Sequence, residues 1–179
     1  MYYLILDLEA TCWKFPKTPE EQEIIEIGAI IVNPYGEIET RFQSLVKPFI
    51  HPRLSHYCED LTGITQRDVD RARDFPEVFD EFRAWLEEYE GYLPSSWGAF
   101  DERLLRINCF QNDLDPFWSN GFANLKKQYQ QIKQLKKPIG LRSAVEKEGF
   151  EFSGPHHRAL SDAENTAKIF TKYLDEWIF

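Results

Sequence analysis

Leu4-Ile5-Leu6-Asp7-Leu8-Glu9-Ala10-Thr11 lies near the start of the chain and changes from apolar to acidic within the length of one strand. The run Tyr2–Leu6 is apolar throughout, which is typical of a strand buried on both faces. Asp7 and Glu9 are two residues apart, so in a strand their side chains leave the same face. Two carboxylates at the end of a buried strand are unfavourable unless cations or hydrogen-bond donors meet them.

A divalent cation would compensate these two charges. Carboxylate oxygens suit Mg²⁺ or Mn²⁺ better than they suit Zn²⁺. Taken alone, Asp7 and Glu9 are more simply explained as solvated carboxylates at a strand end. The rest of the chain favours a metal site.

Length and composition indicate one folded domain over residues 1–179. The hydrophobic content of 42% and aromatic content of 15% are those of an ordinary globular protein. The sequence shows neither an apolar run of membrane-spanning length nor a signal peptide. Three cysteines without metal-type spacing suit a reducing compartment. We therefore expect a cytoplasmic location and no membrane partner.

The charge is unevenly distributed along the chain. The net charge is −9, which by itself argues against a nucleic-acid partner. The window Pro116–Val145, however, contains six Lys or Arg residues and no Asp or Glu. An acidic protein with one basic strip could still guide a polyanion along that strip.

The spacing of apolar residues predicts a mixture of strands and helices along the chain. The sequence shows no repeats and no internal domain boundary. A loop is expected over Cys12–Gln22. Further strands are expected at Ile24–Val32, Ile38–Val46 and Tyr92–Trp97, the first two forming a hairpin. Helices are expected within Leu54–Thr65 and at Phe75–Tyr89, Asp101–Phe110, Ala123–Leu135, Gly140–Glu148 and Ala159–Trp177, with Asp74 as the N-cap of the second.

Two more acidic positions complete a possible site. Asp101 follows a predicted strand and opens a helix, a usual place for function in α/β folds, although a helix N-cap is the simpler explanation of this residue alone. His157 and Asp162 stand at the start of the last helix, where a single histidine is more often a surface residue. Four acids and a histidine in this order are much less expected by chance.

With these residues in view, the sequence resembles the DEDDh family of 3′→5′ exonucleases. Asp7 and Glu9 match its first motif, Asp101 its second, and His157 with Asp162 its third. The resemblance covers essentially the whole chain and looks closest to the ERI-1-like branch. That similarity rests on Asp7–Cys12, Leu61–Ile64, Trp97-Gly98, Gly140-Leu141 and His157–Ala159. It implies an RNase H-like fold with a central mixed five-stranded sheet flanked by helices.

The resemblance also implies a chemistry. Such an enzyme hydrolyses phosphodiester bonds from the 3′ end of single-stranded RNA, with DNA as an alternative, and releases nucleoside 5′-monophosphates. Two divalent ions, Mg²⁺ or Mn²⁺, assist the displacement. By the family pattern Asp7 bridges the ions, Glu9 and Asp162 bind the first, and Asp101 holds the second through water. His157 is the expected general base.

Substrate contacts are expected at four further positions. The backbone of Ala10 and Thr11 is placed to meet the terminal sugar. Phe100 or Trp97 could stack on the last base, although core packing is the better explanation of Trp97 and an equal one for Phe100.

A basic helix face is expected to track the phosphates behind the scissile one. Lys126, Lys133 and Lys137 fall at i, i+7 and i+11 within the predicted helix, opposite an apolar stripe. A solvated face is the alternative explanation of these lysines. No separate RNA-binding segment is expected, so selectivity would come from the nuclease domain or from a partner.

Two other functions remain open from the sequence. One is a nucleic-acid-binding module that has kept the fold but has little activity. The other is an exonuclease confined to short oligonucleotides or to proofreading.

Overall fold

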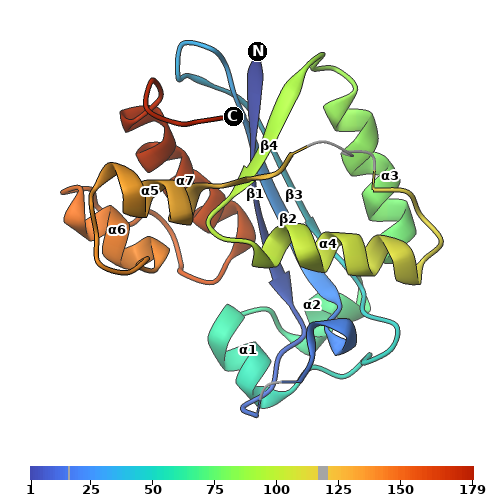
Figure 1. Cartoon of the computed structure of the whole chain (residues 1–179). Coiled ribbons are helices and arrows are strands. Elements are labelled where there is room, and N and C mark those ends of the chain that lie inside the picture. Colours follow the sequence, from blue (N-terminus) through green and yellow to red (C-terminus); the bar gives the residue numbers. More distant parts are fainter. Residues whose placement is uncertain (16, 117–120) are drawn as a thin grey trace.

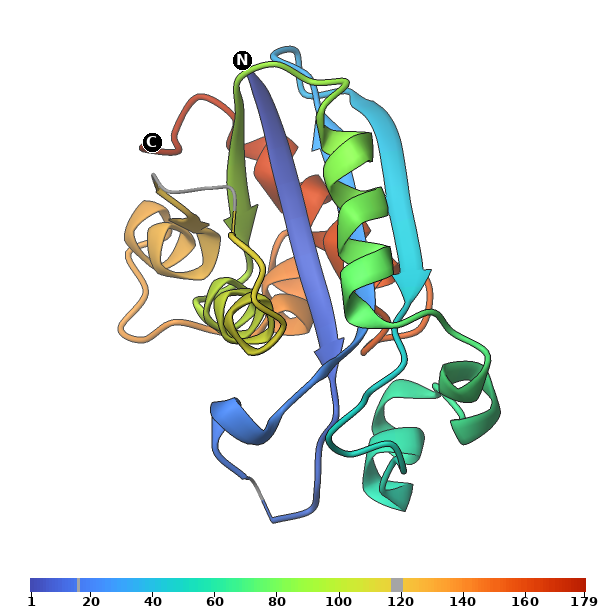
Figure 2. The same ribbon diagram turned by 90° about the vertical axis from the view of Figure 1, so that its right-hand side faces the viewer.

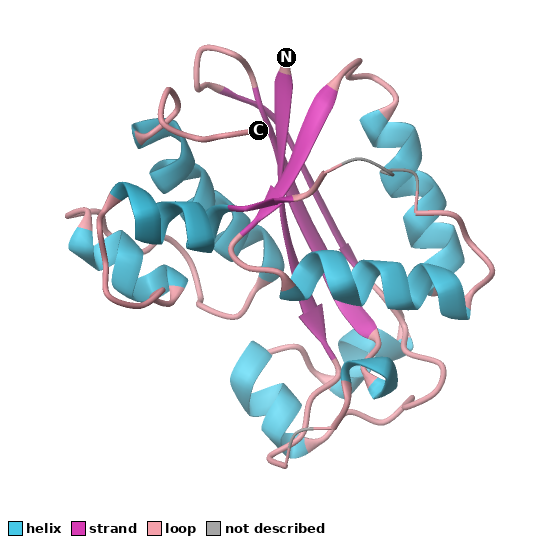
Figure 3. Ribbon diagram, in the orientation of Figure 1, coloured by secondary structure: helices cyan, strands magenta, loops and turns pink. Residues whose placement is uncertain are grey.

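A five-stranded mixed sheet forms the centre of the molecule in the computed structural model, which describes residues 1–15, 17–116 and 121–179 (Figures 1 and 3). The strands are β1 (Tyr2–Ala10), β2 (Ile24–Val32), β3 (Ile38–Leu45), β4 (Tyr92–Ser96) and β5 (Ala123–Asn124). Their order in the sheet is β3-β2-β1-β4-β5. Strands β1–β2 and β2–β3 pair antiparallel, whereas β1–β4 and β4–β5 pair parallel. The predicted α/β fold with a mixed five-stranded sheet is confirmed.

Helices cover both faces of this sheet. They are η1 (Pro19–Glu21), α1 (His56–Thr62), α2 (Gln66–Asp70), α3 (Phe75–Leu86), α4 (Phe100–Gln111), α5 (Leu125–Ile132), α6 (Leu141–Lys147) and α7 (Ala159–Lys172). Figure 2 shows α3 in front of the sheet and α7 behind it. No helix within the described ranges is long and apolar enough to cross a membrane. Pro16 of the predicted loop and residues 117–120 of the basic window lie outside the described residues.

Most predicted elements are confirmed, but three helices are shorter than expected. The predicted helix Ala123–Leu135 begins only at Leu125, because Asn124 ends the short edge strand β5 and its side chain accepts the Lys127 N–H as an N-cap. Helix α3 ends at Leu86 and not at Tyr89. Helix α7 ends at Lys172 and not at Trp177.

The end of α7 has a clear physical cause. The Trp177 indole folds back onto Phe170, with ring centroids 5.7 Å apart, and donates its N–H to the Phe170 carbonyl at 2.8 Å. This bond needs a turn after α7, so Trp177 is not part of the helix although it lies in the core.

Alternation along β1 decides which face carries the acidic residues. Leu4, Leu6 and Leu8 pack into the apolar cluster that also contains residues of α3 and α4. Ile5 packs into the second cluster, with residues of α5, α6 and α7. The strand is buried on both faces, as predicted. Because Asp7 and Glu9 share the parity of Ile5, their side chains leave on the α7 face.

The start of α7 lies unusually close to β2. A Cβ atom added to Gly28 would stand 2.2 Å from the Ala159 carbonyl carbon. The absence of a side chain at this position therefore sets the depth at which α7 packs on the sheet.

We expect Gly28→Ala to lower the free energy of unfolding by about 3 kcal/mol or more, because backbone atoms of α7 must move away from the new methyl group. Denaturant unfolding of the metal-free protein measures the loss. Gly140→Ala is the matched control, since nothing lies within 4 Å of its added Cβ. Equal stability of the two variants would show that the close approach does not constrain the fold.

Candidate active site

Three carboxyl groups from two elements meet near the carboxyl end of β1. Oxygen atoms of Asp7, Glu9 and Asp162 lie within 4.8 Å of one another. Glu9 is 8% exposed and Asp162 is 6% exposed, while Asp7 is partly buried. Asp162 comes from the first turns of α7, on the face of the sheet from which Asp7 and Glu9 project. The structure therefore brings together two of the three motifs that are distant in sequence.

Asp101 joins this group from α4. It is the second residue of that helix, and its Oδ1 accepts the Leu8 N–H at 3.1 Å. Leu8 stands between Asp7 and Glu9, so the bond anchors Asp101 to the acidic part of β1. The N-cap of α4 is Ala99, which makes no side-chain capping bond. The alternative explanation of Asp101 as a helix N-cap is therefore wrong.

Burial and mutual repulsion hold these carboxyl groups in their protonated forms to unusually high pH. Burial raises the pKa of Asp7 well above its ordinary value, and the charges of Asp101, Glu9 and Asp162 raise it further. Burial, with the charge of Asp162, raises the pKa of Glu9 to about 9. Burial also raises the pKa of Asp162 to about 7 and that of Asp101 to about 6, against the opposing effect of a backbone N–H donor in each case.

These raised pKa values and the donor set fit a divalent cation. Asp162 Oδ1 is buried and has no hydrogen-bond partner among the described residues, and Asp162 is a member of the close carboxylate group. A buried oxygen without a partner is unfavourable unless a cation or water completes it. All the donors are carboxylates, which are the ligands of Mg²⁺ and Mn²⁺ and not those of a thiolate- or imidazole-preferring metal.

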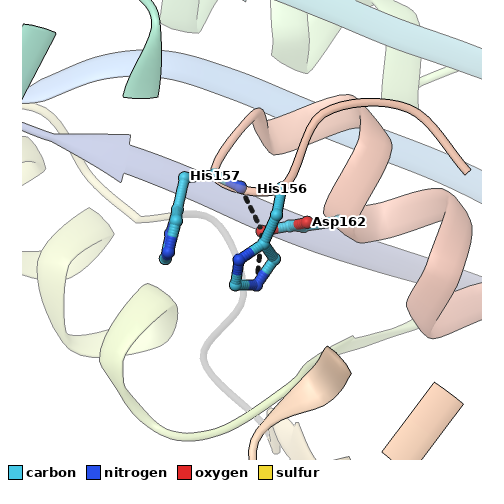
Figure 4. A group of neighbouring side chains, drawn as sticks. All are labelled: His156, His157 and Asp162. Carbon is cyan, nitrogen blue, oxygen red and sulfur yellow. Dashed lines mark hydrogen bonds and ion pairs between the residues drawn. The ribbon is translucent and has the colours of Figure 1, made fainter. Parts of the chain in front are cut away.

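Two consecutive histidines stand beside Asp162 (Figure 4). His157 precedes the N-cap residue of α7 and has a left-handed backbone, with φ of 63°. Its backbone N–H donates to Asp162 Oδ2 at 3.2 Å. The nearer imidazole is that of His156, whose Nε2 lies 3.9 Å from the same oxygen. The two rings are in contact, with centroids 3.9 Å apart.

Both imidazoles are biased toward the neutral form. Burial lowers the pKa of His157 below its ordinary value. Burial, followed by the charges of His157 and Arg142, lowers the pKa of His156. The sequence left the sign of this effect open, because a helix N-terminus and nearby carboxylates act in opposite directions. In the structure the pKa of both rings is lowered, so each ring can accept a proton at neutral pH.

Glu26 on β2 holds the start of α7 in place. Its fully buried carboxylate accepts bonds from Arg158, at 2.8 Å from Nη2 and 3.0 Å from Nε, and from the Ala159 N–H at 2.9 Å. Gln43 donates a further bond at 2.7 Å. Arg158 directly follows His157, so this clasp fixes the backbone that carries the histidine. Because Glu26 is also the cross-strand neighbour of Glu9, the Arg158 charge lies close to the acidic group.

The sequence analysis assigned no role to Glu26. A signal was nevertheless present, since Glu26 is the single charged residue in the apolar run Ile24–Val32. A charged residue in a fully buried strand requires a partner. The partner itself could not be identified from sequence, because Arg158 is 132 residues away.

Trp97 and Phe100, the two candidates for stacking on a base, lie in different environments. Trp97 packs against Tyr129, with ring centroids 5.4 Å apart, and its indole N–H donates to the Ile139 carbonyl at 3.2 Å. Trp97 is therefore a packing residue, as the sequence favoured. Phe100 is 43% exposed at the first position of α4, next to Asp101. It remains available to a ligand.

Ala10 and Thr11 differ from the expectation that their backbone meets a sugar. The Thr11 N–H donates to the Glu23 carbonyl at 2.8 Å, and the Thr11 carbonyl accepts a bond from Gln22 at 3.1 Å. The Ala10 carbonyl accepts the Cys58 thiol at 3.5 Å. Both residues are also nearly inaccessible, at 7% and 2% exposure. In this conformation the Thr11 N–H and both carbonyl groups are engaged in bonds within the protein.

The predicted basic face on one helix is wrong. Helix α5 ends at Ile132, so Lys137 lies beyond it and only Lys126 is inside it. Lys133 is the C-cap, and its Nζ bonds the Tyr173 hydroxyl at 2.9 Å and lies 3.3 Å from Glu148 Oε1. Although burial opposes it, hydrogen bonds from Lys172, Tyr129, Tyr173 and Lys133 lower the pKa of Glu148 to about 2. Lys133 therefore serves the packing of α5 against α6 and α7.

Comparison with known proteins places this arrangement in a family. Residues 4–170 match the family described as Exonuclease (RNase_T). Human ERI1 exoribonuclease 2 is 32% identical over 97% of this chain, and rat 3′-5′ exoribonuclease 1 is 33% identical over 98% of it. The chain spans 28% and 53% of the length of these two relatives.

A solved structure shows the same fold. The nuclease domain of 3′hExo, described as a DEDDh family member and bound to rAMP, is 34% identical with a TM-score of 0.90. The match covers 97% of this chain and 92% of that one.

We expect the metal-free protein to lose stability as the pH rises from about 5 to 9. Each acidic residue of the site has a higher pKa in the folded chain than in the unfolded one. Its contribution to stability is therefore complete below its unfolded pKa and is lost as the pH rises through the folded value, which is about 6 for Asp101, about 7 for Asp162 and about 9 for Glu9. Melting curves in chelator across this range measure the slope.

Asp162→Asn should flatten this pH dependence and leave the metal-free protein at least as stable as the parent, because one of the mutually repelling charges is removed. Asp60→Asn, which replaces an exposed carboxylate on α1, should follow the parent. A large loss of stability in Asp162→Asn at every pH would show that this carboxylate stabilises the fold and does not destabilise it.

Proposed function

Because this chain belongs to the DEDDh 3′–5′ exonuclease family, in its ERI1-like branch, we propose that it hydrolyses phosphodiester bonds from the 3′ end of single-stranded RNA. The products would be nucleoside 5′-monophosphates. The similar nuclease domain that is bound to rAMP supports a ribonucleotide product at this kind of site. DNA is the alternative substrate.

One observation carries the proposal. Four carboxyl groups from three separate elements and a histidine with a lowered pKa meet at one end of β1. Such a group has no use in the stability of the fold, because its members repel one another. It is suited to holding cations against a phosphodiester.

The residues have distinct proposed roles. Asp7, Glu9, Asp101 and Asp162 would hold two divalent ions, Mg²⁺ or Mn²⁺, with Asp7 shared between them. Such ions, when bound, stabilise the attacking and leaving oxygens of an in-line displacement at phosphorus. Asp101 is kept in position by the Leu8 N–H, and Asp162 by the His157 N–H. Asp162 is thus oriented through Oδ2, and its unpartnered Oδ1 is left for a ligand.

His157 is the proposed general base. Its lowered pKa keeps the imidazole neutral near pH 7, so a ring nitrogen can take the proton from the attacking water. The left-handed backbone and the Glu26–Arg158 clasp fix the position from which the ring enters the site. His156 is the competing candidate, because its Nε2 is the nitrogen near Asp162.

Phe100 is the proposed stacking residue for the terminal base. Its ring is 43% exposed, and it is the immediate neighbour of Asp101. Stacking on an aromatic ring tolerates every base, which suits an enzyme that removes nucleotides in succession.

The proposal is tested by a time course on RNA and DNA of equal sequence, labelled at the 5′ end, with Mg²⁺ or Mn²⁺. We expect a ladder that shortens from the 3′ end, and faster loss of RNA than of DNA. Asp162→Asn should produce no ladder. If the parent shortens neither substrate while still binding them, the chain is a binding module and the proposal fails. Hydrolysis of dinucleotides alone would instead identify an enzyme for short oligonucleotides.

His157→Ala should slow hydrolysis by about 10²–10⁴-fold while metal and RNA affinity stay nearly unchanged, because only proton transfer is lost. The residual rate should rise with pH as hydroxide replaces the missing base. His156→Ala serves as the control and should keep most of the activity. If the two variants exchange these phenotypes, His156 is the base.

A further inference from the structure

Two loops at the carboxyl end of β1 combine aromatic and basic side chains without any acidic residue. The first covers Cys12–Phe15 and Lys17–Thr18, and the second covers Lys47–Tyr57. We use the name aromatic–basic surface for their exposed members Lys14, Phe15, Lys17, Phe49, Ile50 and Arg53. The chain has a net charge of −9, whereas these two loops carry only positive charges.

The two loops lie together in space. The rings of Trp13 and His51 are in edge contact, with centroids 4.9 Å apart. The Ser55 hydroxyl donates to the Cys12 carbonyl at 2.6 Å. Both segments extend below the sheet in Figure 1, beside α1 and α2. They therefore form one surface and not two separate loops.

The apolar members of this surface are unusually exposed. Phe49 is 91% exposed, Phe15 is 81% exposed and Ile50 is 52% exposed. Single exposed apolar residues are common on proteins and need no explanation. Several at one end of the molecule, interleaved with cations, indicate a surface for a ligand.

A buried acid fixes the second loop in the conformation that displays these side chains. Glu23 is 7% exposed, and its carboxylate accepts the backbone N–H groups of Phe49, Ile50 and His51 at 2.6, 2.8 and 2.6 Å. Three donors on one carboxylate hold this backbone firmly. The exposure of Phe49 and Ile50 is therefore built into the fold and is not the accident of a loose loop.

A cavity of about 270 Å³ opens beside these two residues. Phe49 and Ile50 line it together with Lys47, Gln111 and Asn112 and with the two acids Glu23 and Asp74. The apolar side chains and the amides suit the face and the edge of a base, whereas the acids make the cavity itself unsuited to a phosphate.

The cations of the surface are available to a polyanion. Lys17 lies 4.3 Å from the centroid of the Trp13 ring, and its ion pair with Glu21 is long, at 3.7 Å, and solvent-exposed. An exposed pair of this kind contributes little, so the ammonium can turn to a phosphate. Lys14 and Arg53 are exposed.

The first of the two loops follows directly on the strand that carries Asp7 and Glu9. Trp13 is four residues after Glu9 and Phe15 is six, so Phe15 lies at most about 22 Å from Glu9 along a fully extended chain. When the 3′-terminal nucleotide occupies the site of a 3′→5′ exonuclease, all remaining contacts must be made with the part of the strand on its 5′ side.

We propose that the aromatic–basic surface binds the segment of a single-stranded nucleic acid on the 5′ side of the bond to be cleaved. This inference rests on the proposed function, and it names the place where substrate length is sensed. Phe15 and Phe49 stack on bases, while Lys14, Lys17 and Arg53 neutralise phosphates. A protein with an acidic, aromatic segment is the alternative occupant, but exposed rings interleaved with cations favour a strand that offers a base and a phosphate at every residue.

The test compares binding and hydrolysis of long and short substrates. Affinity for a fluorescent single-stranded RNA 20-mer is measured over a range of salt in an Asp162→Asn background, where no cleavage occurs. Phe15→Ala with Phe49→Ala should weaken binding about 10- to 100-fold. Lys14→Gln with Lys17→Gln should flatten the dependence of log K on log salt by about 1.4. With Asp162 intact, all these variants should hydrolyse a dinucleotide at the parent rate.

Tyr35→Ala is the matched control, because it removes an aromatic ring that is 85% exposed in the turn between β2 and β3. It should bind the 20-mer as the parent does. Unchanged affinity and salt slope in the loop variants would overturn the inference, and so would an equal loss in the control. Failure of the parent to hydrolyse any substrate would refute the proposed function instead, so the two failures are distinguishable.

Discussion

Repulsion among four carboxyl groups that are largely withdrawn from water is the constraint that the rest of this fold must satisfy. The groups come from β1, α4 and α7, and each element is fixed independently. Asp101 is tied to β1 through the Leu8 N–H, and Asp162 is tied to the chain before α7 through the His157 N–H. Backbone donors of this kind favour the charged form, yet burial and like charges dominate at Asp162, with a pKa of about 7. The fold itself must therefore support the cost of bringing these groups together.

The junction of β2 and α7 provides most of this support. Gly28 lets the helix approach the strand more closely than any side chain would allow, and Glu26 fixes its first residues through Arg158 and the Ala159 N–H. A side chain at residue 28 and a missing charge at residue 26 would have different effects. The first would change the depth of α7, and the second would release the backbone that carries His157. The junction of β2 and α7 therefore controls both the packing of the core, through Gly28, and the geometry of the site, through Glu26.

The sequence predicted most of the fold and the acidic group, because those features depend on local periodicity and on residue types with few other uses. Strand β2 was predicted with its observed bounds, and the four acids converge as their order implied. The errors arise where distant residues decide. Asn124 ends an edge strand that exists only beside β4, and the end of α7 depends on where Trp177 folds back. The role of Glu26 required knowledge of Arg158, and the exposure of Phe49 required knowledge of Glu23.

Lys133 shows why composition alone does not identify the cations that are free to meet a ligand. The window with the largest local excess of positive charge includes Lys133, yet this residue shares the buried carboxylate of Glu148 with Lys172. Such a cation is already neutralised, and withdrawing it would leave a buried carboxylate with one partner fewer. The two loops of the aromatic–basic surface carry at least as many basic residues per length, theirs are exposed, and neither loop contains an acid. An acidic protein can thus guide a polyanion without a basic surface overall. In the proposed arrangement the exposed cations of the two loops would meet the phosphates, while buried acids such as Glu23 and Glu26 hold the backbone in place.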